Sequence, residues 1–182
     1  MGAVMTPVFY IFGSVAVISA LIVCGFRWTA IFTALFLILL AAAGAADVNK
    51  GIVPDMLVIL IAVLAIVEFL IFDLSVHNAL IRFAGALVIS VPMLVAALIV
   101  KNGFGGGDIK LIAAAGLFLG LEKTIIAGII AFFISGIYAV YLLLSKKGGA
   151  KSKIRLAPFL AIGCAFSELF GTAFLFIFSS YI

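Results

Sequence analysis

The strongest constraint on this chain is a series of apolar stretches, each about as long as a bilayer is thick. A transmembrane helix needs about 20 apolar residues, and stretches of that length follow one another along most of the 182 residues. Hydrophobic residues make up 68% of the chain and charged residues 10%, whereas soluble domains are roughly half apolar and roughly one quarter charged. A soluble domain of this size could not bury so much apolar surface. The sequence therefore predicts an all-α, polytopic integral membrane protein and excludes soluble enzymes and nucleic-acid binders.

Six stretches have the length of a membrane span, and a further stretch, 109–121, is shorter. The shorter stretch either crosses the membrane as a thin helix or dips in and returns. A crossing is favoured because it places the basic cluster at 146–155 on the cytoplasmic side, as the positive-inside rule requires. We therefore expect six to seven transmembrane helices in a single membrane-embedded domain, 1–182. The longer spans are predicted near residues 5–25, 28–46, 54–72, 80–100, 124–144 and 156–178.

This topology places two aspartates at membrane boundaries on the same, cytoplasmic, side of the membrane. Asp47 follows the second predicted span, and Asp108 precedes the short stretch 109–121. Paired carboxyl groups can hydrolyse a peptide bond without a metal: one takes a proton from water, and the other polarises the scissile carbonyl. Two carboxyl groups within a few ångströms cannot both ionise cheaply, so such a pair shares one proton. We expect Asp47 and Asp108 to meet and to titrate as a pair.

A glycine-rich cytoplasmic loop precedes Asp108, with glycine at 103 and at 105–107. Glycine permits close backbone approach, so this loop could lie beside an extended substrate strand. Asp108 is expected to begin the short helix that follows, where the helix dipole favours a negative charge. The alternative for each feature alone is ordinary: an aspartate at a helix start is often a cap, and a glycine-rich loop is often a turn.

Three blocks of sequence, in order, resemble the type IV prepilin peptidases, and the resemblance covers roughly residues 40–170. The first, Asp47-Val-Asn-Lys-Gly-Ile-Val-Pro54-Asp55, is similar to their pattern of Asp, six residues, Pro and Asp or Asn. Gly105-Gly-Gly-Asp108-Ile-Lys-Leu111 resembles their second signature. The segment 155–163, Arg-Leu-Ala-Pro-Phe-Leu-Ala-Ile-Gly, resembles the start of their last helix.

The resemblance implies a membrane aspartic endopeptidase of the Gly-x-Gly-Asp type. Such enzymes remove the short basic leader from prepilins and pseudopilins at the cytoplasmic face of a prokaryotic inner membrane. Asp47 and Asp108 occupy the catalytic positions, with prepilin substrates and the lipid bilayer as partners, and no metal or organic cofactor is implied. The residues expected to shape the site or the substrate path are Pro54, Asp55, Gly105, Gly106, Gly107 and Lys110.

Larger relatives carry an N-terminal region with two C-x-x-C pairs and N-methylate the mature pilin. Here the two cysteines, Cys24 and Cys164, form no such pair. We therefore expect leader cleavage and no N-methyltransferase activity.

The same residues are also compatible with two other functions. An ion- or proton-coupled transporter could use Asp47, Asp108 and Glu168 as an ion path, whereas a non-catalytic subunit would use the aspartates only to assemble partners. Glu168 lies near the middle of the last predicted span, where an ionisable group is expensive; we expect it to be protonated and hydrogen-bonded to a neighbouring helix. The basic cluster at 146–155 is expected to orient the chain against anionic lipid.

Overall fold

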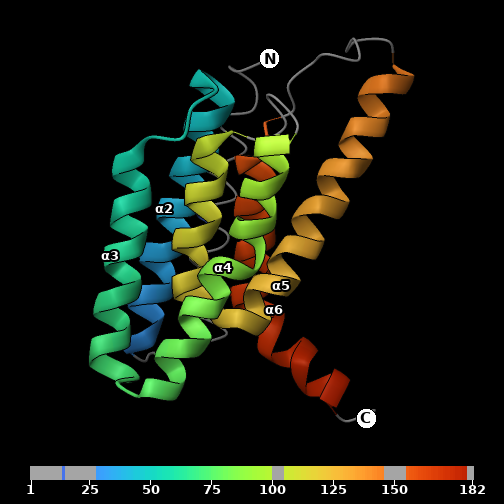
Figure 1. Ribbon diagram of the computed structural model, residues 1–182. Helices are drawn as coiled ribbons and strands as arrows, with labels where there is room; N and C mark the ends of the chain where they lie inside the picture. The colour runs from blue at the N-terminus through green and yellow to red at the C-terminus, as the bar shows by residue number, and fades with distance from the viewer. Residues whose placement is uncertain (1–13, 15–27, 100–104, 146–154, 180–182) are drawn as a thin grey trace.

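In the computed structural model every described element is an α-helix. The structure describes residue 14 and residues 28–99, 105–145 and 155–179. Helices are the expected form of apolar runs in a membrane, because a helix satisfies its backbone hydrogen bonds internally. The all-α prediction is confirmed over these ranges. The helices, shown in Figure 1, are α2 (Trp28–Lys50), α3 (Asp55–Phe72), α4 (Val76–Ile99), α5 (Gly106–Leu144) and α6 (Ala157–Ser179).

Within the described part of the chain, four helices are long and apolar enough to cross a membrane, judged by length and composition. α6 contributes a shorter apolar stretch, Ala157–Gly171. The first predicted span, 5–25, lies outside the described residues, so the predicted total of six to seven spans stays a prediction. The four candidate spans are Thr29–Lys50, Asp55–Phe72, Val76–Ile99 and Gly106–Leu142.

Gly120 divides α5 into two halves that run in opposite directions. Its φ of +76° is a left-handed backbone conformation, which glycine adopts without steric cost. In Figure 1 the first half (yellow) runs away from the end of the bundle where α5 begins, and the second half (orange) returns toward that end. The halves correspond to the predicted stretches 109–121 and 124–144.

Small residues let the helices approach one another closely. Gly85 of α4 packs against the backbone of Gly116 in the first half of α5, and Gly163 of α6 packs against the backbone of Ala127 in the second half. Close backbone packing at small residues is a main source of helix association in membranes, where lipid is as apolar as the helices themselves. These two crossings fix both halves of α5 against their neighbours.

The helix termini that surround the two predicted aspartates meet at one end of the bundle, which we call the site end. The C-terminus of α2 and the N-termini of α3, α5 and α6 lie there (Figure 1). Helix N-termini carry unpaired N–H groups and a partial positive charge. The bundle therefore directs several backbone donors toward the space in which both predicted aspartates lie.

Candidate active site

Asp47 and Asp108, far apart in the sequence, line the same cavity at the site end. The cavity has a volume of about 370 Å³. Asp47 is 5% exposed and Asp108 is 9% exposed, and the two carboxyl groups are near enough for the charge on one to act on the other. The structure thus brings together the two residues that the sequence singled out. The other lining residues are Gly51, Ile52, Val53, Pro54, Asp55, Gly105, Gly106 and Gly107.

Asp47 lies in the last turn of α2, which ends at a glycine. Gly51 has a φ of +69°, and its N–H donates to the Asp47 carbonyl oxygen at 2.7 Å. A left-handed glycine with this hydrogen bond is a common helix C-terminus. The Oδ2 atom of Asp47 is buried and has no hydrogen-bond partner among the described residues, so this oxygen is free for a shared proton or a water.

Asp108 is held by the first turn of α5. Its backbone N–H donates to the Gly105 carbonyl oxygen at 3.1 Å, and its carboxylate accepts a hydrogen bond from the Gly105 N–H. The contact of the Asp108 carboxylate with the Gly105 N–H is one half of a capping box, and the other bond is a backbone turn because glycine has no side chain to accept it. The prediction that Asp108 begins the helix is wrong by two residues: Gly106 and Gly107 are helical because the Asp108 carboxylate stabilises the turn before it.

The N-terminus of α6 contacts both aspartates, which sequence reasoning missed. The backbone N–H of Ala157, the first residue of α6, lies within hydrogen-bonding range of the Asp47 and Asp108 carboxylates. This N–H has no partner within its own helix, and the following residue, Pro158, has no N–H to offer. The only sequence signal was the third block of the family resemblance, which begins at Arg155.

Arg155 approaches the pair from the segment that leads into α6. Its guanidinium donates a hydrogen bond to the carbonyl oxygen of Val48, next to Asp47, and its charge acts on the Asp47 carboxyl group. The sequence grouped Arg155 with a basic cluster facing lipid and did not predict this contact.

Lys110 is paired with Asp55 rather than placed to act on Asp108. The Lys110 Nζ and Asp55 Oδ1 atoms are 2.8 Å apart, and both side chains are exposed. Pro54 precedes the first residue of α3, Asp55, in an extended conformation, as expected for a helix start. Pro54 and Asp55 line the cavity, and Lys110 adjoins it through its ion pair with Asp55.

A second polar cavity, of about 350 Å³, lies at the opposite end of the bundle. Its acidic side chains contact cations: Glu68 lies 2.6 Å from Arg82, and Glu168 lies 2.9 Å from Lys123. Glu168 also accepts a hydrogen bond from Thr33 of α2. The expected hydrogen bond to a neighbouring helix is present, but Glu168 is in an ion pair, because the second half of α5 brings Lys123 to it. An ion path through Glu168 would have to break this pair.

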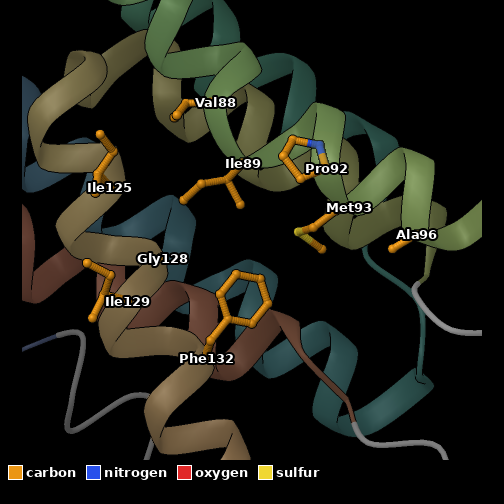
Figure 2. A pocket seen from close by; sticks show the side chains of 9 residues that line it. All are labelled: Val88, Ile89, Pro92, Met93, Ala96, Ile125, Gly128, Ile129 and Phe132. Carbon is orange, nitrogen blue, oxygen red and sulfur yellow. The ribbon is translucent and has the colours of Figure 1, made fainter.

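A third cavity, of about 520 Å³, lies between α4 and the second half of α5. Figure 2 shows that side chains from both helices, among them Ile89, Pro92 and Phe132, border it. Because the residues that line this cavity carry no ionisable group, the cavity can hold apolar groups but offers no acid or base for catalysis. Among the three cavities, the one at the site end combines two buried carboxyl groups with backbone donors.

Comparison with known proteins agrees with this geometry. Residues 34–140, which include Asp47 and Asp108, match the type IV leader peptidase family. The chain is 27% identical over 136 residues to the prepilin leader peptidase/N-methyltransferase of Bacillus subtilis, which is 75% of this chain and 54% of the relative. The chain thus spans about half the length of the curated relative it matches, and no solved structure matches it significantly. Because the family match covers more than half of the chain, this protein belongs to the type IV leader peptidase family.

Proposed function

We propose that this protein is a membrane aspartic endopeptidase that removes the short basic leader from type IV prepilins or pseudopilins. The observation that carries the proposal is the placement of Asp47 and Asp108, both buried, in one cavity of a chain that belongs to a peptidase family. The name of the Bacillus subtilis relative supports prepilins as the substrate class.

The aspartate pair supplies the two functions that peptide hydrolysis needs. The ionised carboxylate takes a proton from a water molecule, whose oxygen attacks the scissile carbonyl carbon. The protonated carboxyl group donates a hydrogen bond to the carbonyl oxygen and stabilises the charge that develops there. Collapse of the tetrahedral intermediate breaks the C–N bond, and the leaving amine takes up the proton that the first carboxylate removed from water, which restores the singly protonated pair. This mechanism needs only water and the two carboxyl groups.

The first turn of α5 allows a substrate backbone to approach the pair. Gly105, Gly106 and Gly107 carry no side chains on the wall of the cavity beside Asp108. An extended peptide can therefore lie close to the carboxyl groups, with the Lys110–Asp55 ion pair beside the cavity.

We further propose that the site end faces the cytoplasm of a prokaryote and that the chain is a single membrane-embedded domain of six to seven spans. The support is the distribution of basic residues in the sequence, since the cluster at 146–155 falls between α5, whose second half runs toward the site end, and α6, which begins there. We propose cleavage without N-methylation, because the cysteine pairs of the larger relatives have no counterpart in this sequence.

A cleavage assay in lipid or detergent tests the proposal. Prepilins with a basic leader are incubated with the wild type, Asp108→Asn and, as a matched control, Glu122→Gln, which removes an exposed carboxylate outside the site. We expect the wild type and the control to release the leader and Asp108→Asn to release none. Mass spectrometry locates the scissile bond and detects any added methyl group. Leader release by folded Asp108→Asn at the wild-type rate would overturn the proposal.

A further inference from the structure

Arg155 links the start of α6 to the end of α2. Its guanidinium donates to the Val48 carbonyl oxygen, one of the last carbonyls of α2, which have no partner within the helix. It also lies against Gly51: a Cβ atom placed there would be 3.7 Å from the Arg155 Nη2 atom. A cation at a helix C-terminus is favoured by the helix dipole. The contact therefore holds the Arg155 charge in a defined place beside Asp47.

The charged groups around Asp47 come from several elements. Asp108 of α5 presents a like charge, and Arg155 presents an opposite one. Lys50 lies one turn further along α2 but is exposed, so water screens its charge. Beside the cavity, the charges of Asp55 and Lys110 neutralise each other in an ion pair. Among the described residues, Arg155 is the cation whose charge acts on Asp47.

Hydrogen bonds alone do not decide which carboxyl group ionises. The Ala157 N–H is shared by both, and the Gly105 N–H contacts Asp108 alone. Both N–H groups are neutral, whereas Arg155 carries a full positive charge, which acts on Asp47 and whose attraction for a carboxylate falls off only slowly with distance. Because two close carboxyl groups hold one negative charge between them, the member beside Arg155 retains it.

We propose that Arg155 is a positioning residue that stabilises the ionised form of Asp47, so that Asp47 is the general base and Asp108 carries the shared proton. This assignment rests on the proposed peptidase function. It also gives the segment before α6 a role in the chemistry: Arg155 sets the charge of the pair, while the Ala157 N–H two residues later holds both carboxylates in place.

The pH dependence of cleavage tests the assignment. In Arg155→Gln the acid limb of the kcat/KM profile is expected to move to higher pH by about one unit, because an opposite charge nearby shifts a carboxyl group by that order. Arg155→Lys keeps the charge and should retain a profile close to that of the wild type. Lys50→Gln removes a cation one helical turn from Asp47 without this contact and should leave the profile unchanged. Circular dichroism confirms that each variant is folded.

Two outcomes overturn the proposal. A folded Arg155→Gln variant whose profile superimposes on that of the wild type shows that Arg155 does not act on the pair. An equal shift in Lys50→Gln shows a general charge effect rather than a specific contact.

A second readout does not depend on activity. Carbodiimide reagents react with protonated carboxyl groups, so labelling followed by mass spectrometry reports where each proton lies. In the wild type, Asp108 is expected to label at higher pH than Asp47, and this difference should shrink in Arg155→Gln. The reverse order would overturn the assignment. If the wild type cleaves no prepilin, the peptidase proposal fails, and the labelling order still shows separately whether Arg155 acts on Asp47.

Discussion

Gly85 of α4 and Gly116 of α5 cross backbone against backbone: a Cβ atom placed on Gly85 would lie 2.7 Å from the Gly116 carbonyl oxygen. The same Cβ would lie 2.6 Å from the carbonyl carbon of Gly120. Real Cβ atoms do not approach backbone atoms this closely, so neither glycine can carry a side chain without moving a helix. The crossing therefore fixes the first half of α5, which carries Asp108 at its start.

Replacing Gly85 with alanine should destabilise the protein by roughly 1–3 kcal/mol, the usual cost of forcing extra atoms into a packed contact. The measurement is the midpoint of thermal unfolding in detergent. Gly136→Ala is the matched control, since a Cβ atom at Gly136 has nothing within 4 Å; it should leave the midpoint unchanged or raise it. Equal unfolding midpoints for Gly85→Ala and Gly136→Ala would contradict the close packing of α4 against α5.

The glycines of the first turn of α5 should differ in their tolerance of a side chain. A Cβ atom on Gly107 would lie 3.1 Å from the Cβ of Val53, a buried residue that lines the cavity, whereas one on Gly106 meets nothing within 4 Å. Val53 is branched at Cβ and has few alternative rotamers. Gly107→Ala should therefore displace the cavity wall and lower kcat/KM by between about ten- and a hundredfold.

Gly106→Ala is the comparison for this effect: it adds a methyl group to the same cavity wall but displaces no neighbouring atom, so it should lower kcat/KM less than Gly107→Ala does. Both changes replace glycine with alanine in the same helical turn, so they alter the intrinsic helix preference equally. A loss of the same size in both variants would show that helix flexibility, and not the cavity wall, limits cleavage.

The two aspartates should behave as one catalytic unit. Asp47→Asn and Asp108→Asn each remove a proton donor or acceptor, so each should lower cleavage by roughly 10²–10⁴-fold or more. Because neither residue works without the other, the double variant should be no slower than the slower single variant. Single-turnover assays of the three folded variants check this. Losses that multiply in the double variant would indicate independent roles.

The Lys123–Glu168 ion pair should stabilise the fold without taking part in cleavage. The side chains are 23% and 11% exposed, so Glu168→Gln leaves the Lys123 charge largely buried and unpaired, at a cost of roughly 3 kcal/mol. Replacing both residues, as Lys123→Met with Glu168→Leu, should recover much of that loss. The measurement is the midpoint of thermal unfolding, compared among the wild type, Glu168→Gln, Lys123→Met, Glu168→Leu and the double variant.

The cleavage rate of the folded Glu168→Gln variant should match that of the wild type, because Glu168 lies at the opposite end of the bundle from the aspartate pair. A loss of cleavage by fully folded Glu168→Gln would instead show that the two ends of the bundle are functionally coupled. Loss of an ion gradient-dependent transport activity in the same variant would favour the transporter alternative.

The helical, membrane-embedded character of this protein was determined by the sequence alone. Runs of about 20 apolar residues have one stable form in a bilayer, because only a helix satisfies its own backbone there. Local signals also set helix ends: the span predicted near 54–72 is α3, which begins at Asp55, directly after Pro54. The predicted second span ended at 46, where charge begins, but α2 continues to Lys50, since a helix stops at the left-handed Gly51 and not at the first polar residue.

What the tertiary structure decided is which distant residues meet. The contact of Arg155 with Val48, the shared Ala157 N–H, and the pairing of Lys110 with Asp55 and of Lys123 with Glu168 all join separate helices. Hydropathy does not encode these pairings, because a helix that faces lipid and a helix that faces its neighbours are both apolar all round. They depend on how the helices cross, and the crossings are set by packing at single glycines such as Gly85, Gly116 and Gly163.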